Sequence, residues 1–137
     1  MTDAARTNGY FIGLMSGTSM DGVDGVLATF SAQAQSGETE STSTSVHVLA
    51  HASLPMPTSL QRELLALNSP GDNELHRAAV SAHALVRLYA QVCQRLLAQS
   101  GIEATDIKAI GAHGQTVRHR PGAVDACDAT HTKHTQH

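Results

Sequence analysis

The sequence has 137 residues, a length that fits one domain and allows a sizeable core. Its formal net charge is −3, and it has no Trp, two Tyr and two Phe. Nucleic acid and anionic membranes need a basic face, and base stacking needs aromatic side chains, so these features exclude both partner classes. The polar N-terminus has no apolar signal core, and no stretch reaches the roughly 18 apolar residues of a membrane span. We therefore expect a cytoplasmic protein.

Three strands are predicted in the first half of the chain. Residues 10–15 (YFIGLM) form a nearly continuous apolar run, typical of a buried strand. Residues 23–30 resume as a strand with Val26, Ala28 and Phe30 on one face, and residues 46–52 give a third, which makes an antiparallel meander. The turn between the first two, residues 16–22 (SGTSMDG), is longer than a tight hairpin needs, which suggests that it holds something. The polar stretch 31–45 is expected to be an exposed loop.

From residue 58 the apolar period becomes that of helices. Residues 58–68 are predicted to form a short amphipathic helix. After the Ser69-Pro70-Gly71 breaker, Asp72 or Asn73 is expected to cap a longer helix that ends at Ser100-Gly101. The apolar stripe predicted for this helix consists of Leu75, Ala79, Ala82, Val86, Tyr89, Cys93 and Leu96.

A last strand, also expected to be buried, is predicted over residues 107–112, so the fold class is α/β with the order β-β-β-α-α-β. The folded part is expected to cover residues 10–122, after a flexible stretch at 1–9. Residues 123–137 have no apolar periodicity and are expected to form a disordered tail. The histidines of this tail, at 131, 134 and 137, fit no standard metal-ligand spacing.

The turn SGTSMDGVD carries the residue types that hold phosphate. Gly17 and Gly22 allow backbone N–H groups to approach a ligand, and hydroxyl donors follow Gly17 at positions 18 and 19. Asp21 and Asp24 are candidates to organise Mg²⁺, most simply through water. The alternative is a Gly-rich hairpin whose polar residues only stabilise the turn, since the string is neither a Walker loop nor a Rossmann fingerprint.

A second polar string, residues 109–122 (AIGAHGQTVRHRPG), leaves the end of the last strand, where α/β sheets usually bind ligands. His113, Gln115 and Thr116 can hydrogen-bond sugar hydroxyls, and Arg118 and Arg120 can bind a carboxylate or phosphate. The alternative is a polar surface turn with two solvated arginines.

Together, FIGLMSGTSMDGVD and AIGAHGQTVRHRP, with LQRELLALNSPGDNELHRAA between them, resemble the anhydro-N-acetylmuramic acid kinase family over residues 10–122. The resemblance implies an incomplete N-terminal part of an actin/hexokinase-like (ribonuclease H-like) lobe, with ATP bound between two lobes in the full family. The positions it implies for ATP contact are Gly17, Thr18, Ser19, Met20, Asp21, Gly22, Val23 and Asp24. Those it implies for the sugar are His113, Gln115, Thr116 and Arg120.

The implied reaction uses ATP and Mg²⁺ to open the anhydro ring of an amino sugar with water and phosphorylate its 6-oxygen, in cell-wall recycling. Full-length members are expected to be homodimers. This chain departs from the family because members are more than twice as long, and no counterpart of their catalytic aspartate occurs in residues 123–137. We therefore expect an out-of-frame tail, no catalytic residue and an inactive chain. A non-catalytic nucleotide- or sugar-binding module and a remnant that binds nothing remain as alternatives.

Overall fold

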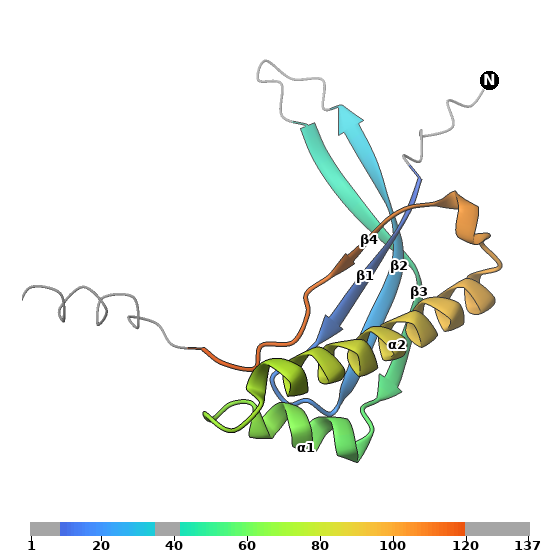
Figure 1. Cartoon of the computed structure of the whole chain (residues 1–137). Helices are drawn as coiled ribbons and strands as arrows, with labels where there is room; N and C mark the ends of the chain where they lie inside the picture. Colours follow the sequence, from blue (N-terminus) through green and yellow to red (C-terminus); the bar gives the residue numbers. More distant parts are fainter. Residues whose placement is uncertain (1–8, 35–41, 120–137) are drawn as a thin grey trace, which may run out of the picture.

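The first three strands form an antiparallel meander, and the fourth joins it at one side. The computed structural model describes residues 9–34 and 42–119. Strands β1 (Tyr10–Ser16), β2 (Gly22–Ala34) and β3 (Thr42–Pro55) pair in sequence order, and β4 (Ile107–Ala112) pairs with β1 in parallel. The sheet order is therefore β3-β2-β1-β4 (Figure 1). The predicted α/β class and element order are confirmed, with a short 3₁₀ helix η1 (Ala104–Asp106) added before β4.

Strands β2 and β3 extend beyond their predicted ends. Residues 31–34 pair with 42–45, a part of the chain expected to be loop. The hydroxyl oxygens of Ser31 and Ser45 lie 2.6 Å apart across the ladder. The expectation was wrong here because a paired ladder satisfies the backbone N–H and C=O groups even of a polar, low-complexity sequence. The expectations for residues 1–8, 35–41 and 120–137, including Arg120 and the tail histidines, lie outside the described residues.

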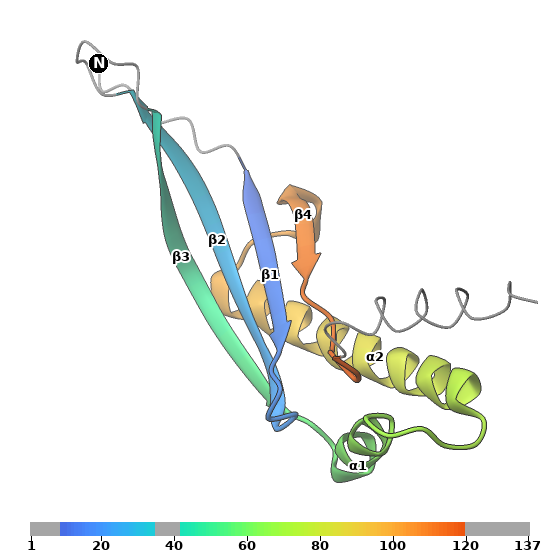
Figure 2. The same cartoon turned by 90° about the vertical axis from the view of Figure 1, so that its left-hand side faces the viewer.

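Two helices connect β3 to β4. Helix α1 (Thr58–Ala66) leads to α2 (Glu74–Ser100), which packs across β2 and β3 on one face of the sheet (Figure 2). Helix α2 ends as predicted at Gly101, which has φ of +71° and donates its N–H to the Leu97 carbonyl at 2.9 Å. The largest fully buried side chains lie between the sheet and α2, and they are Val23, Leu27, Val92 and Leu96.

The apolar stripe predicted for α2 is wrong in its first half. Tyr89 and Leu96 are buried, but Leu75 is 88 % exposed and Val86 is 61 % exposed. The buried residues of α2 are Ser81, Leu85, Leu88, Tyr89, Val92 and Leu96. The observed stripe is rotated by about one residue, because the larger leucines at 85 and 88 bury more apolar surface than the alanines of the predicted stripe.

Strands β1 and β4 were both expected to be buried, and both are more exposed to solvent than expected. In β1, Ile12 and Leu14 face α2 and are buried, whereas Met15 points away and is 55 % exposed. In β4 every residue after Ile107 is exposed. Within the described residues β4 has β1 as its single neighbour in the sheet. Helix α2 covers the half of the sheet formed by β2 and β3, so β4 is left exposed to solvent.

Candidate functional site

The two polar strings identified in the sequence lie at the same edge of the sheet. Because β1 and β4 are parallel, with Leu14 opposite Ala112, their carboxyl ends meet there. The turn at residues 17–21 follows β1, and residues 113–116 follow β4 (Figure 1). Ligands of α/β sheets usually bind outside the carboxyl ends of the strands. The topology thus brings the candidate phosphate turn and the candidate sugar segment to one place.

Two hydrogen bonds connect the sugar segment to β1. The His113 N–H donates to the Leu14 carbonyl at 3.0 Å, which extends the β1–β4 pairing by one step. The Ser16 hydroxyl donates to the side-chain oxygen of Gln115. Ser16 is 2 % exposed and Gln115 is half-buried, so this bond is largely shielded from water. The two strings are therefore in direct contact through Ser16 and Gln115.

The turn itself is held by its backbone and by one apolar anchor. Met20 has φ of +53° and donates its N–H to the Gly17 carbonyl at 3.1 Å, and its side chain is 3 % exposed within the core. The Asp21 carbonyl accepts the Met56 N–H at 2.8 Å, which fixes the turn to the end of β3. Among the described residues, the N–H groups of Gly17, Thr18 and Ser19 donate no backbone hydrogen bond. These three donors are available to an anion.

The candidate phosphate-contacting residues differ in what they can offer a ligand. Thr18 and Ser19 are exposed, so their hydroxyls are accessible. The side chains of Met20 and Val23 are buried in the core, so these two can offer a ligand only backbone groups. A Cβ on Gly22 would lie 2.7 Å from the Leu54 carbonyl oxygen, so Gly22 is needed for the fold itself.

The two aspartates open onto one surface pocket. The Ser19 hydroxyl donates to Asp21 at 2.7 Å, and this bond is the main cause that lowers the pKa of the Asp21 carboxyl. The Ser53 hydroxyl donates to Asp24 Oδ1 at 2.7 Å, and His51 Nε2 lies 3.7 Å from the same oxygen. The pocket has a volume of about 490 Å³ and is lined by Asp21, Gly22, Asp24, Ser53, Leu54 and Pro55.

The pocket chemistry suits a hydrated cation better than a directly bound one. Both carboxylates are exposed, and each already accepts a hydroxyl hydrogen bond on Oδ1. Over residues 9–34 and 42–119 no three His, Cys, Asp or Glu side chains come together as a metal cluster. Mg²⁺ keeps several waters and binds through one or two carboxylates plus substrate phosphates. The residues therefore fit Mg²⁺ held partly by water and phosphate.

The sugar-segment residues do not line this pocket. His113 and Thr116 are exposed, and the Gln115 amide nitrogen donates to the Thr116 carbonyl at 3.2 Å. Gly114 between them has φ of +77°, a conformation that favours glycine. The segment is thus a tight, exposed turn next to the phosphate turn, with Gln115 as its inward member.

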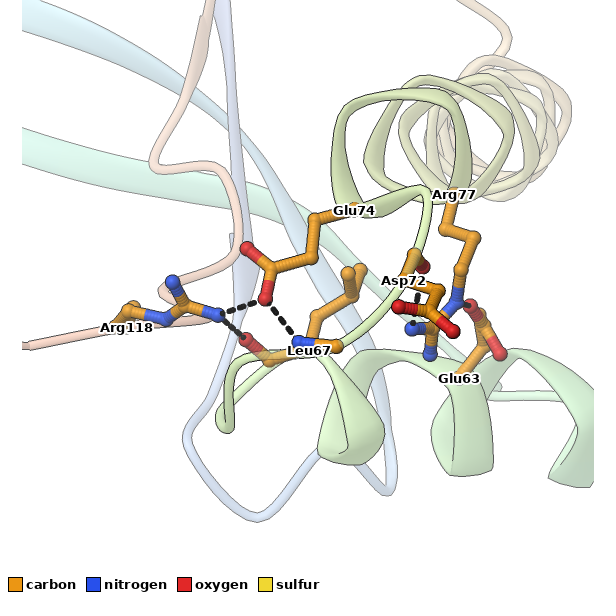
Figure 3. Close-up of polar contacts among 7 residues, drawn as sticks. Glu63, Leu67, Asp72, Glu74, Arg77 and Arg118 are labelled. Carbon is orange, nitrogen blue, oxygen red and sulfur yellow. Dashed lines mark hydrogen bonds and ion pairs between the residues drawn. The ribbon is translucent and has the colours of Figure 1, made fainter.

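Arg118 has a structural partner within the chain, which the sequence-based interpretations of it did not include. Its Nη2 donates to the Leu67 carbonyl at 3.1 Å and to Glu74 Oε1 at 3.0 Å, as Figure 3 shows. The pKa of the Glu74 carboxyl is lowered mainly by the hydrogen bond from Arg118 and next by the one from the Gly71 N–H. Because both bonds use Nη2, Arg118 is not a freely solvated arginine. It instead ties the segment after β4 to the start of α2.

Ser16, Ser53 and Glu74 matter at the site and were not identified from the sequence. Ser16 faces inward at the end of an apolar strand, and only the β1–β4 pairing places it beside Gln115. Ser53 lies opposite Asp24 in the β2–β3 register, which a strand prediction does not give. Glu74 had one sequence signal, since an acidic residue in the first turn of a helix is a common terminus feature.

The chain is similar to known proteins of one family. The family model described as anhydro-N-acetylmuramic acid kinase matches residues 9–130. An anhydro-N-acetylmuramic acid kinase of Variovorax paradoxus is 54 % identical over 120 residues, which cover 88 % of this chain and 29 % of the relative. That of Bordetella pertussis is 56 % identical over 111 residues, which cover 81 % of this chain and 26 % of the relative. That of Cupriavidus pinatubonensis is 47 % identical over 127 residues, which cover 93 % of this chain and 30 % of the relative.

The chain therefore spans about 29 % of the length of the Variovorax relative, with similar shares for the others. The matched residues include both polar strings and the helices between them. No helix of the described residues has the length and apolar character needed to cross a membrane. The family match over most of its length shows that the chain belongs to the anhydro-N-acetylmuramic acid kinase family.

Proposed function

We propose that this chain binds the phosphates of ATP at the turn after β1, as the nucleotide-binding part of an anhydro-N-acetylmuramic acid kinase. The observation that carries the proposal is that the N–H groups of Gly17, Thr18 and Ser19, at the carboxyl edge of the sheet, donate no backbone hydrogen bond to any residue that the structure describes. Several N–H groups in a short turn form a concave site for an anion. The exposed hydroxyl of Thr18 adds a donor, the Ser19 hydroxyl donates to Asp21, and the remaining positions, through Asp24, contribute by backbone or carboxylate.

Mg²⁺ would be held near Asp21 and Asp24. The ion would neutralise the charge that develops on the transferred phosphoryl group, as in other phosphoryl transfers. The hydrogen bonds from Ser19 and Ser53 keep the two carboxylates oriented toward their common pocket. The Ser19 hydrogen bond that lowers the pKa of the Asp21 carboxyl favours the ionised form, which is the form that binds a cation.

The amino sugar would bind beside the phosphates, at the segment after β4. His113 and Thr116 are exposed and can hydrogen-bond hydroxyl groups, and Arg120 would add a cation for the lactyl carboxylate of a muramic acid. Gln115 is oriented by Ser16, so it can position the segment as well as contact the sugar. In a complete enzyme this arrangement would serve the opening of the anhydro ring and the phosphorylation of its 6-oxygen. We propose that this enzyme is a homodimer that recycles cell-wall sugar in the cytoplasm.

Turnover needs a general base on the attacking water in addition to the phosphate site. The aspartate base expected from the family has no counterpart in residues 123–137 of the sequence. We therefore propose that the 137-residue chain binds nucleotide without converting the sugar. A non-catalytic nucleotide-binding module is the second candidate, and it shares the same phosphate turn.

Calorimetric titration of the purified chain with ATP, ADP and AMP in Mg²⁺ tests the proposal. We expect the affinity to fall as phosphates are removed, because the donors of the turn contact phosphate and not adenine. A parallel assay for ATP-dependent phosphorylation of the anhydro sugar should show no product. Equal affinities for the three nucleotides, or none, would contradict the phosphate site, and product formation would contradict the inactive chain.

A further inference from the structure

Tyr89 of α2 carries a buried hydroxyl group without a partner. Its side chain is 7 % exposed and belongs to the core cluster between α2 and the sheet. The hydroxyl oxygen is shielded from solvent and makes no hydrogen bond among the residues that the structure describes. Buried polar groups are usually hydrogen-bonded, because a buried hydroxyl without a partner costs free energy. Such a group indicates a role beyond the packing of the ring.

The group that faces this hydroxyl is the backbone N–H of Gly114, in the segment after β4. Burial raises the pKa of the Tyr89 hydroxyl, and the Gly114 N–H opposes this rise. An N–H group has this effect at close range, because its hydrogen bond favours the ionised oxygen. Gly114 is half-buried, and within the described residues its N–H donates no backbone hydrogen bond. An unused donor and an unused acceptor thus lie next to each other.

The chain is held on both sides of Gly114. Before it, the His113 N–H donates to the Leu14 carbonyl at 3.0 Å. After it, Val117 packs against the core cluster that contains Tyr89. Figure 1 shows this segment passing beside the first half of α2. Gly114 lies between these two anchors, in a turn where its φ is +77°.

We propose that Tyr89 is a positioning residue for the sugar segment, residues 113–116, and that its hydroxyl accepts the Gly114 N–H when this segment binds the sugar. This N–H belongs to the peptide bond after His113, so rotation of that peptide completes the hydrogen bond. The His113 backbone is then fixed at both of its peptide bonds, by Leu14 and by Tyr89, which gives the exposed imidazole one direction. Tyr89 acts through His113 and does not touch the sugar, because its hydroxyl is enclosed. This inference rests on the proposed sugar site and adds a residue of α2 to it.

Tyr89→Phe removes the hydroxyl and keeps the ring. Thr29→Val is the matched control, because Thr29 has the other buried hydroxyl without a partner among the described residues and lies opposite Tyr10, at the far end of β1. Calorimetry of the 137-residue chain measures the affinity for Mg·ATP and, with Mg·ATP present, the affinity for 1,6-anhydro-N-acetylmuramic acid. We expect Tyr89→Phe to bind the sugar about fivefold more weakly, the usual effect of one hydrogen bond, and to bind Mg·ATP as the parent does. Thr29→Val should bind both ligands as the parent does.

Two further measurements separate this role from a purely structural one. In urea unfolding, Tyr89→Phe should be at least as stable as the parent, because the lost hydroxyl has no partner in the free chain. In amide hydrogen exchange followed by NMR, the sugar should slow the exchange of the Gly114 N–H in the parent and in Thr29→Val. In Tyr89→Phe the sugar should leave this exchange rate unchanged.

Equal sugar affinities of the parent and Tyr89→Phe would overturn the inference and leave the proposed sugar site standing. Equal losses in Tyr89→Phe and Thr29→Val would overturn it as well, since they would report the removal of any buried hydroxyl. A loss of sugar affinity that comes with a loss of stability in Tyr89→Phe would show a structural role instead. A parent chain that binds Mg·ATP but not the sugar would overturn the inference together with the sugar site, and would leave the phosphate site standing.

Discussion

The Ser16 hydroxyl donates a hydrogen bond to the side-chain oxygen of Gln115, although the two residues are 99 positions apart in the sequence. Ser16 ends β1 and precedes the phosphate turn, and Gln115 lies in the segment after β4. The bond is thus a direct physical connection between the two halves of the candidate site. Its loss should affect the stability of this edge and the geometry of both halves.

Ser16→Ala removes the donor and leaves the Gln115 oxygen without its partner. We expect the free energy of unfolding to fall by about 1 kcal/mol, the usual net value of such a bond. Urea unfolding monitored by circular dichroism measures this loss. Ser59→Ala, at an exposed position of α1, is the matched control and should change stability little. Equal stabilities of the two variants would show that the bond contributes nothing.

Gly25→Ala should disrupt the contact between β2 and α2. A Cβ at this position would lie 2.4 Å from Val92 Cγ1 and 3.0 Å from Leu14 Cδ2. Overpacking of this kind costs about 1–3 kcal/mol. Gly111→Ala in β4 is the control, because its Cβ would meet no heavy atom within 4 Å. Denaturant midpoints of the two variants should therefore differ clearly, and matching midpoints would contradict the packing of α2 on β2.

Leu88→Ala tests which face of α2 is buried. Leu88 is 7 % exposed, and its truncation should cost about 2–5 kcal/mol, as for other buried leucines. Leu75→Ala removes the same atoms from a side chain that is 88 % exposed and should stay within about 0.5 kcal/mol of the parent. Thermal and urea unfolding measure both. A larger effect of Leu75→Ala would restore the stripe predicted from the sequence.

The Arg118–Glu74 pair predicts an acid-sensitive contribution to stability. The pKa of the Glu74 carboxyl in the folded chain lies below its ordinary 4.5. The contribution of the pair is therefore present above that value and is lost as the pH falls through the folded-state pKa. Glu74→Gln should be less stable than the parent at pH 7, and the difference should fade in acid. Melting temperatures between pH 3 and about 7 follow this change.

Glu103→Gln controls for the loss of a carboxylate elsewhere, because Glu103 is exposed and forms no ion pair among the described residues. It should melt as the parent does at both ends of this pH range. A difference between the parent and Glu74→Gln that is the same at every pH would contradict the ion pair.

Much of the fold could be predicted from the sequence because local patterns determine it. The run before Ser16, the Ser69-Pro70-Gly71 breaker and the Gly101 stop each act over a few residues, and β4 has the predicted bounds. The rotation of α2 could not be predicted, since its sequence contains two apolar stripes, one rich in leucine and one in alanine. Contact with the sheet selects the leucine stripe as the buried one. The openness of β4 depends on what lies beside it, which no local pattern contains.

The candidate site divides in the same way. The residue types of the phosphate turn are visible in the string SGTSMDGVD, because donors close together in sequence are close in space. The contacts made by Ser16, Ser53 and Arg118 join segments far apart in sequence, so they required the sheet register and the α1–α2 arrangement. Arg118 shows the consequence, since no local pattern indicates its partner Glu74, which lies 44 positions away.

Calorimetric titration of Gly17→Ala with Mg·ATP, beside the parent chain, tests directly whether the turn after β1 binds the phosphates of ATP. The nearest heavy atom to a Cβ at Gly17 is Ser19 Oγ at 3.5 Å, so the fold accommodates alanine while the added methyl group crowds the N–H donors of the turn. Gly111→Ala controls for the substitution itself. We expect Gly17→Ala to bind ATP at least about tenfold more weakly, a loss of about 1.4 kcal/mol. Unchanged affinity in a folded Gly17→Ala chain would contradict it.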